Sequence, residues 1–531
     1  MAKKILYTPI SRRQFLKYGI ATGSAAFFAA QGMHAFAQEG GTMVWLGHQE
    51  VSGLGPDDIG PTIHEAVIYN ILNPLFHINY LTELEPVLAE SYEVSPDGLQ
   101  YTFNIRQGVL FHDGTELTSE DVKYTFDYYR DPANATSIAN NFLNVESVDT
   151  PDDYTVVVNM SAVNAAFLSN AGEVPIVPAA YHREVGESTF RTQPIGTGGF
   201  RLREWRAAEF TELEAFDDHF RGRPSVDILR LEVVPEASVR YIALLTGEAQ
   251  SSVWPLLVED SVSLEGDPGF RVIRTLANSV KHFPLNNQLP QLSDKRVRQA
   301  MMHAIDRQRI IEDLWNDAAE IAHSNLAPKN AFYYNNNLKR YDYNPATAMA
   351  MLDEAGWLMG DDGIRAKDGL KLSFTCTTIT GDQARRPIAE ITQQFFREVG
   401  IDMQLAEAPV ASVLEGMRNG TMDAALFNWT YGTTPEPDPS QNLRSDGGNN
   451  FCSYNNPEMD ALIDEGLTVV DPEARKPIYD RIQEIFVEDV PALYLQFDQW
   501  INVFSTDVEG LPEDVLSGDP LYYQGHEYGR G

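Results

Sequence analysis

Short strand-like segments alternate with amphipathic helical segments from Gln38 onward, and this alternation constrains the fold most. Residues 42–46 form a first predicted strand. Leu229, Leu231 and Val233 alternate with charged residues, as in a half-buried strand. Further strands are predicted over 101–105, 250–253, 370–375 and 424–429. A chain of 531 residues with this pattern is expected to form α/β layers in two or three domains.

Start signals mark several of the intervening helices. Thr118 and Asp121 form a capping box, and Leu117 and Val122 are placed as a hydrophobic staple around it. Asn344 followed by proline is typical of a helix start. Apolar spacing predicts one long helix over 296–315, a helix that stops near Gly247 and a helix over 388–399.

Motifs of enzyme chemistry are absent from the sequence after residue 37. It contains no Gly-x-Ser-x-Gly and no His-Glu-x-x-His, and the glycine run at 196–199 lacks both the third glycine of a dinucleotide fingerprint and a P-loop lysine. With 76 acidic residues, carboxylate pairs arise by chance and do not indicate acid–base catalysis. We therefore expect no catalytic residue, no metal site and no cofactor.

The chain is strongly acidic, with a formal net charge of −36. Such a surface repels nucleic-acid phosphates and anionic lipid headgroups, so neither is an expected partner. Solubility alone explains this charge, although a field that attracts cationic ligands stays open as an alternative. The only two cysteines are Cys376 and Cys452, and whether they pair also stays open.

The first 37 residues resemble a twin-arginine export signal. Arg12 and Arg13 precede Phe15-Leu16-Lys17, a mild apolar run follows, and small residues at Ala35 and Ala37 predict cleavage before Gln38. The run is too short to act as a permanent membrane anchor, and no cysteine near the cleavage site can carry a lipid. The resemblance implies a soluble protein that the twin-arginine export machinery moves, already folded, into the periplasm.

Several strings of residues occur together, in one order, along nearly all of the exported chain. They are Leu88–Gly98, Phe103–Val109, Phe111–Thr115, Pro194–Phe200, Arg296–Ala300, Ala304–Arg307, Ala355–Trp357 and Tyr454–Asp460. This ordered set resembles extracellular solute-binding protein family 5, which includes the dipeptide, oligopeptide and nickel receptors of ABC importers. Each string alone is weak, whereas the ordered set is specific.

The resemblance implies a periplasmic-binding-protein fold of the Venus-flytrap type, with two α/β lobes and an additional small domain, in the three-domain arrangement called cluster C. Lobe I would comprise 38–79, 197–284 and 496–531, the small domain 80–196, and lobe II 285–495. Ligand would be enclosed between the lobes around a hinge. The implied function is a monomeric receptor that delivers a small polar solute, most often a peptide, to ABC importer permease subunits.

Candidate ligand contacts follow from the rule that α/β sheets bind ligands outside the carboxyl ends of their strands. Three predicted strand ends carry suitable side chains: His48, Gln49 and Glu50 after the first strand, Trp254 after 250–253, and Asn428, Trp429 and Tyr431 around the end of 424–429. Each tryptophan offers a stacking face, although either one could instead pack in the core.

One departure from the family bears on the ligand. In family members that bind peptides, an aspartate three residues after the tryptophan that resembles Trp429 binds the α-amino group of the peptide, and here that position is Gly432. Glu436 or Asp438 could substitute, or could only support the loop. Oligosaccharides, opine-like compounds, metal chelates and cationic solutes therefore stay open as ligands. A periplasmic hydrolase or a peptide chaperone stays open as a different class of function.

Overall fold

The computed structural model describes residues 41–59, 62–254, 256–382, 384–430, 437–516, 519–523 and 525–530. The export signal with Arg12 and Arg13, its predicted cleavage site, and the candidate residues Tyr431, Gly432 and Glu436 lie outside the described residues. Within the described ranges, the search for membrane spans finds no helix with the length and apolar character that crossing a bilayer requires.

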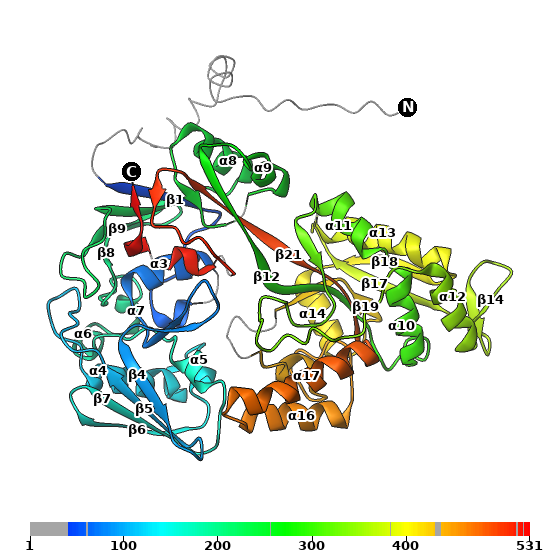
Figure 1. The fold of residues 1–531 in the computed structure, drawn as a ribbon, viewed down its shortest axis with the longest axis horizontal. Coiled ribbons are helices and arrows are strands. Elements are labelled where there is room, and N and C mark those ends of the chain that lie inside the picture. Colours follow the sequence, from blue (N-terminus) through cyan, green and yellow to red (C-terminus); the bar gives the residue numbers. More distant parts are fainter. Residues whose placement is uncertain are drawn as a thin grey trace.

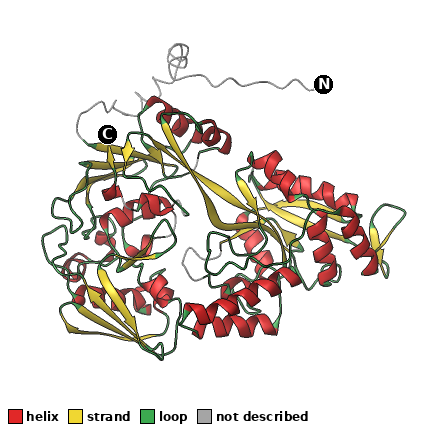
Figure 2. Ribbon diagram, viewed as in Figure 1, coloured by secondary structure: helices red, strands yellow, loops and turns green. Residues whose placement is uncertain are grey.

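Two lobes lie side by side, and two long antiparallel strands run from one to the other (Figure 1). These strands are β12 (Phe270–Pro284) and β21 (Ala492–Ser505). Among the described residues they form the centre of a mixed sheet of nine strands, in the order β20-β12-β21-β11-β1-β10-β9-β8, with β13 also paired to β21. Helices lie on the outer faces of both lobes (Figure 2).

The first lobe holds the parallel part of this sheet, in which β1 pairs with β10 and β11. Its elements are β1 (Thr42–Gly47), α3 (Thr62–Ile71), β2 (Phe76–Ile78), β3 (Leu84–Pro86), β8 (Phe200–Arg206), β9 (Phe210–Ala215), β10 (Ile228–Val233), α8 (Ala237–Thr246), β11 (Ser251–Ser252), α9 (Val258–Ser263), β22 (Val508–Glu509) and β23 (Gly529–Arg530).

A separate antiparallel sheet lies beneath the first lobe in Figure 1, with the strand order β4-β5-β7-β6. Its elements and the helices beside it are β4 (Ala89–Val94), β5 (Gln100–Ile105), α4 (Ser119–Arg130), β6 (Val145–Asp152), β7 (Thr155–Met160), α5 (Phe167–Ala171), α6 (Ala179–Val185) and α7 (Glu187–Phe190). The predicted start of α4 is confirmed, since Asp121 accepts a hydrogen bond from the backbone N–H of Thr118 at 2.9 Å.

The second lobe contains a parallel sheet of order β18-β17-β19 and most of the long helices. Its elements are α10 (Lys295–Ala304), α11 (Arg307–Trp315), β13 (Ala319–Ile321), α12 (Pro345–Glu354), β14 (Leu358–Met359), β15 (Arg365–Lys367), β16 (Leu370–Lys371), β17 (Ser373–Ile379), α13 (Arg385–Glu398), β18 (Asp402–Ala408), α14 (Val410–Arg418), β19 (Ala424–Ala425), β20 (Phe427–Thr430), α15 (Ser440–Leu443), α16 (Pro457–Thr468) and α17 (Pro472–Asp489).

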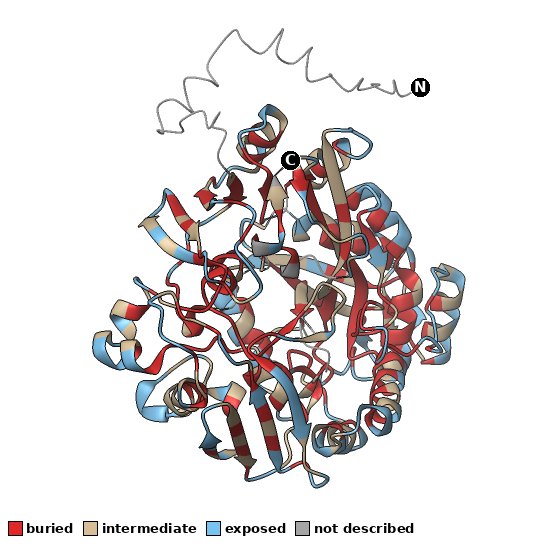
Figure 3. Ribbon diagram, turned by 60° about the vertical axis from the view of Figure 1, so that its left-hand side comes forward, coloured by how far each residue is buried: buried red, intermediate tan, exposed pale blue. Residues whose placement is uncertain are grey.

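The two lobes have separate apolar cores, and β12 and β21 contribute different residues to each. Buried residues are coloured red in Figure 3. Ile273 of β12 and Phe504 of β21 belong to the core of the first lobe. Val280 and Phe497 of the same two strands belong to the core of the second lobe. Because the cores are separate, β12 and β21 can act as the hinge about which one lobe moves relative to the other.

Three predicted elements are wrong in detail. The single helix predicted over 296–315 is two helices, because Ile305 is extended and the Asp306 carboxylate caps a new helix by accepting from the N–H of Arg309 at 3.0 Å. The single strand predicted over 424–429 divides at Leu426. Its first part pairs with β17 in the parallel sheet, and its second part pairs with β12 in the large sheet.

The predicted strand over 370–375 is also divided. Its start is β16, which pairs with β15 in a small hairpin sheet, whereas its end belongs to β17. The α/β fold class itself is confirmed. The domain boundaries stay a prediction, in which the antiparallel sheet falls within 80–196 and the parallel sheet within 285–495.

Candidate functional site

The region where β12 and β21 pass between the lobes contains a break in strand pairing. Leu276 pairs with Gln499 and Val280 pairs with Phe497, so residues 277–279 of β12 lie opposite the single residue Asp498 of β21. An insertion of this kind interrupts the ladder of hydrogen bonds and bends the strand. The break is therefore a natural position for bending between the lobes.

Three rings from three neighbouring strands meet on the first-lobe side of this break. The ring of His48, directly after β1, lies 4.4 Å from that of Trp254, with 35° between their planes. Trp254 follows β11 and lies 5.7 Å from Trp500 of β21, edge to face at 66°. Trp254 is 37% exposed, and His48 and Trp500 are partly exposed. The structure thus brings together two predicted site residues and adds Trp500.

The environment of His48 disfavours the charged form of its imidazole. Burial lowers its pKa, and the positive charge of Arg240 lowers it further, whereas a contact with the side chain of Gln49 raises it. Arg240 is itself buried in α8, and its guanidinium donates to the carbonyl oxygens of Val234 and Pro235 at 2.7 and 2.8 Å. The cluster therefore consists of three aromatic rings, and its one titratable ring is shifted toward the neutral form.

The other two predicted residues after β1 are exposed. Gln49 lies beside His48, as its contact with that ring shows. The Glu50 carboxylate turns toward the hairpin between β8 and β9, where it accepts a hydrogen bond from the N–H of Ala208 at 2.6 Å. Contact of either residue with a ligand stays a prediction, and the geometry gives Glu50 a role in holding the hairpin.

Strand β20 brings two predicted residues to the second-lobe side of the break. Its last residue, Thr430, pairs with Ser279 of the interrupted segment. Asn428 is half-buried, and its side-chain oxygen accepts from the guanidinium of Arg385 at 3.3 Å. Arg385 also pairs with Asp382 and lies over the ring of Phe427. Asn428 is therefore held by a cation that the sequence analysis did not identify.

Trp429 is only 4% exposed and belongs to the core of the second lobe. Its ring lies 4.3 Å from that of His282 and stacks at 6.2 Å on Phe451. Burial lowers the pKa of His282 to about 3, with the charge of Arg385 as a smaller cause. Ligand contact by Trp429 stays a prediction, but in this conformation the indole forms part of the packed wall behind β20.

A buried ion pair stabilises the crossing itself. The ammonium of Lys281, 5% exposed, donates to the Asp498 carboxylate at 2.6 Å and lies 4.3 Å from the ring centre of Trp315. Asp498 also accepts from the amide of Gln496 at 2.8 Å. Because removing one partner would leave a buried charge without compensation, this pair fixes where β21 passes the break in β12.

Asp438 has a structural partner close to it. Its carboxylate accepts from the backbone N–H and the hydroxyl of Ser440, the first residue of α15, at 2.8 and 2.9 Å. This arrangement matches the scaffolding alternative for Asp438.

The sequence analysis did not identify Trp500, Arg385, Lys281 or His282. Trp500, Lys281 and His282 depend on pairing between strands that are distant in sequence, and Arg385 reaches Asn428 from helix α13 by a side-chain contact across 43 residues; neither leaves a local pattern. The polar residue Gln499 directly before Trp500 interrupts a long apolar segment. This interruption is a local signal that could have indicated a partly exposed Trp500.

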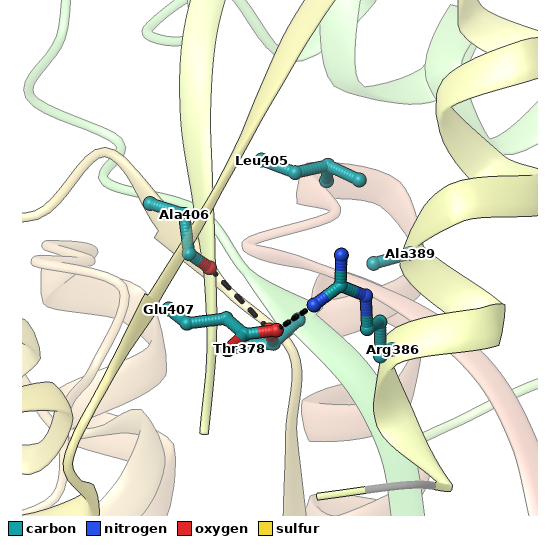
Figure 4. Close-up of a pocket in the computed structure, with 6 residues that line it drawn as sticks. All are labelled: Thr378, Arg386, Ala389, Leu405, Ala406 and Glu407. Atoms are coloured by element: carbon teal, nitrogen blue, oxygen red, sulfur yellow. Dashed lines mark hydrogen bonds and ion pairs between the residues drawn. The ribbon is translucent and has the colours of Figure 1, made fainter. Parts of the chain in front are cut away.

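A small pocket of about 230 Å³ lies elsewhere, between α13 and the strands β17 and β18 (Figure 4). Arg386 and Glu407 form an ion pair across it, and the hydroxyl of Thr378 donates to the carbonyl of Ala406 at 3.3 Å. Its volume is below the roughly 300–1,000 Å³ of usual ligand sites. None of the described candidate residues lines it, so it is not the predicted site.

The second lobe also touches the region of the antiparallel sheet, away from the crossing strands (Figure 1). The carbonyl of Leu467, at the end of α16, accepts from the N–H of Ala165 beside the antiparallel sheet at 3.2 Å. Close by in sequence, Val470 faces the turn between β4 and β5, where a Cβ on Gly98 would lie 2.6 Å from Cγ2 of Val470. The second lobe is thus joined to the rest of the chain by β12 and β21 and also contacts the antiparallel-sheet region.

Comparison with known proteins identifies a family match over most of the chain. The model of bacterial extracellular solute-binding proteins, family 5, matches residues 83–451. Oligopeptide-binding protein AppA of Bacillus subtilis is 30% identical over 441 residues, which cover 80% of each chain. Heme-binding protein A of Haemophilus influenzae is 26% identical over 470 residues, which cover 83% of this chain and 84% of the relative.

Solved structures agree with this match. The structure of AppA from Bacillus subtilis in complex with a nonapeptide superimposes with a TM-score of 0.73 at 26% identity, and covers 93% of this chain and 99% of that one. A periplasmic-binding-protein fold of the Venus-flytrap type, with two lobes and a cleft between them, is therefore the architecture of this chain.

Proposed function

Because the chain belongs to the bacterial extracellular solute-binding proteins of family 5, we propose that it captures a small polar solute between its lobes and delivers it to an ABC importer. Proteins of this family bind solutes. The partners in this proposal are the ligand and the permease subunits of the importer, and the receptor acts as a monomer.

One observation supports this function most directly. His48 and Trp254 of the first lobe and Asn428 of the second lobe flank the same break between β12 and β21. A solute held there contacts both lobes at the position where they bend. Binding to both sides stabilises the closed arrangement over the open one, which is the signal that a transporter can distinguish.

A peptide or peptide-like compound is the first ligand class in this proposal, since AppA, an oligopeptide-binding protein, is 30% identical to the chain. Gly432 modifies this expectation, because a buried ammonium needs a paired carboxylate. Without an aspartate at position 432, a peptide would be held in a different way from that of ordinary peptide receptors. Oligosaccharide, opine-like and metal-chelate ligands are the alternatives.

Location is part of the same proposal. The twin-arginine signal at residues 1–37 would direct the folded protein to the periplasm, with removal of the signal near Ala37. An importer receptor must work on that side of the membrane, so the signal and the family agree. Lobe I, the small domain and lobe II are proposed to follow the boundaries given by the sequence.

The experiment is to purify the exported protein without denaturation, release any bound molecule, and identify it by mass spectrometry. Added back, the intact molecule should raise the melting temperature in proportion to RT ln(1 + [L]/Kd) and be recovered unchanged. Recovery of a cleaved product would favour the hydrolase alternative. If no solute from a broad periplasmic extract stabilises the protein, the receptor function is wrong.

A further inference from the structure

The rings of His48, Trp254 and Trp500 form a continuous cluster that the described part of the chain leaves partly exposed. Trp254 keeps 37% of its surface exposed. Large aromatic side chains that stay exposed together are typical of binding surfaces, because burying them on a ligand gains free energy. The distances between ring centres, 4.4 and 5.7 Å, show that the cluster is already assembled.

The positions of these rings follow from strand order. β11 lies between β1 and β21 in the sheet, so the residues that follow β1 and β11 lie next to the segment of β21 that enters the first lobe. His48 and Trp254 occupy the first two places, and Trp500, paired with Thr275, occupies the third. Each ring is thus attached to a strand of the sheet, which gives the surface a fixed shape.

We propose that this surface selects ligands that present the apolar face of an uncharged ring, and that Trp500 transmits the contact to the strand on which the lobes bend. This inference rests on the proposed receptor function and specifies its ligand. A ring placed against Trp254 buries apolar area on a preformed aromatic wall, which favours aromatic and pyranose rings over linear or charged groups.

Trp500 lies two residues from Asp498, the residue that faces the break in β12 and pairs with Lys281. A ligand that contacts Trp500 therefore acts on β21 within about two residues, or ~7 Å, of the bending point. Trp254 sets affinity for the ring, whereas Trp500 makes that affinity depend on the closed arrangement. The two tryptophans have separable roles.

The test uses two peptide pairs that differ in one aromatic ring, and a sugar comparison of a pyranose oligosaccharide with two ringless polyols. Ala-Phe-Ala is compared with Ala-Ala-Ala, Tyr-Gly-Gly with Gly-Gly-Gly, and maltotriose with glycerol and erythritol, by thermal shift followed by calorimetry. The proteins are the mature wild type, Trp254→Ala, Trp500→Leu and the control Trp205→Leu. Trp205 lies on β8, at the opposite end of the sheet from β21.

We expect ring-bearing members of at least one pair to bind the wild type and Trp205→Leu at least tenfold more tightly than their ringless partners. Trp254→Ala should abolish this preference. Trp500→Leu should keep part of the preference but lose the ligand-induced decrease in the radius of gyration. A preference seen only with the peptides would indicate selection of aromatic rings, and one seen only with the sugars would indicate selection of pyranose rings.

Three outcomes contradict the proposal at different levels. Equal binding of ringed and ringless probes, or a preference that persists in Trp254→Ala, overturns the ring selectivity and leaves the receptor function standing. A normal decrease in the radius of gyration in Trp500→Leu overturns the role of Trp500 alone. If no probe of any kind binds and no extract solute does so, the receptor function fails and this inference fails with it.

Discussion

His112 donates a hydrogen bond from Nε2 to the carbonyl oxygen of Gly198 over 3.0 Å, while its Nδ1 accepts one from the N–H of Gly196 at 3.2 Å. Because Nδ1 accepts, the ring is in the neutral tautomer that carries its proton on Nε2. The contact joins the turn at 111–115 to the glycine run at 194–200. Two of the strings that carry the family resemblance, 111–115 and 194–200, are thus in direct contact in the fold.

The neutral state of His112 predicts a pH dependence of stability. Burial is the main reason that its pKa is lowered to about 4, with Arg201 and His219 adding to the effect and Gly198 and Asp113 opposing it. The unfolded chain binds a proton below pH ~6.5, whereas the native ring does not until about pH 4. Stability is therefore lost as the pH falls through this window.

In the variant His112→Gln, the slope of the unfolding free energy against pH between 4.5 and 6 should be smaller by up to ~1.4 kcal/mol per unit. Urea unfolding at pH 4.5, 5.5, 6.5 and 7.5 measures it. Burial also lowers the pKa of His77, His219, His282 and His323, and it raises that of Glu173 to about 8, which acts in the opposite direction. These groups contribute equally to both proteins, so equal slopes would contradict the assignment to His112.

Gly198 also predicts a steric effect. A Cβ at this position would lie 2.3 Å from the carbonyl oxygen of Asn70 and 2.6 Å from the carbonyl carbon of Ile71, both in the backbone of α3. Backbone atoms cannot move aside cheaply, so Gly198→Ala should destabilise the protein by about 1–3 kcal/mol. In the control Gly448→Ala, the nearest atom is the end of the Gln441 side chain at 3.2 Å, and its unfolding midpoint should change little.

Local patterns predicted the elements whose signals lie within a few residues. The capping box of Thr118 and Asp121, the Asn344 cap and the strand 42–46 are all present, since each depends on neighbours in sequence. The sequence missed the end of the first helix in 296–315 because an extended residue, Ile305, interrupts an otherwise continuous apolar face.

The candidate site was predictable only in part, for a physical reason. His48 and Trp254 could be found because parallel strands end at one edge, and strand ends can be recognised locally. Trp500 lies beside Trp254 because distant strands pair, and Arg385 reaches Asn428 from helix α13; neither long-range contact has a local signature. The burial of Trp429 could not be predicted in the same way. Its position at a strand end does not show whether the indole is covered by the core or left open to a ligand.

The burial of Trp429 and the exposure of Trp254 predict losses of stability of different size for the same substitution. Trp429→Ala removes a ring packed on His282 and Phe451 and should cost about 3–5 kcal/mol of stability. Trp254→Ala should cost about 1 kcal/mol or less, because much of the side chain is already in water. Denaturant unfolding of both variants measures the two losses of unfolding free energy. Equal losses would show that Trp254 is part of the core.

The contact of Val470 in the second lobe with the turn at Gly98 in the antiparallel-sheet region predicts an effect on closure. Val470→Asp places a carboxylate against the turn that contains Asp97 and Gly98. Loss of roughly 1–2 kcal/mol there shifts the ratio of closed to open molecules about 5- to 30-fold toward open. The radius of gyration from small-angle scattering should increase without a change in circular dichroism. Val410→Asp, at an exposed residue of α14, is the control, and a similar increase in both would remove this role from Val470.

Export should depend on the two adjacent guanidinium groups of Arg12 and Arg13. Lysine keeps the positive charge but not the planar, multidentate fork of arginine, so a receptor that recognises guanidinium geometry distinguishes the two. The double variant Arg12→Lys, Arg13→Lys should keep the precursor in the cytoplasm. The control Lys3→Arg, Lys4→Arg also keeps the total charge and leaves the arginine pair intact, so it should be exported normally. Cell fractionation with immunoblotting measures both. Normal periplasmic levels of the lysine variant would mean that a different export route is used, while the receptor function would be unaffected.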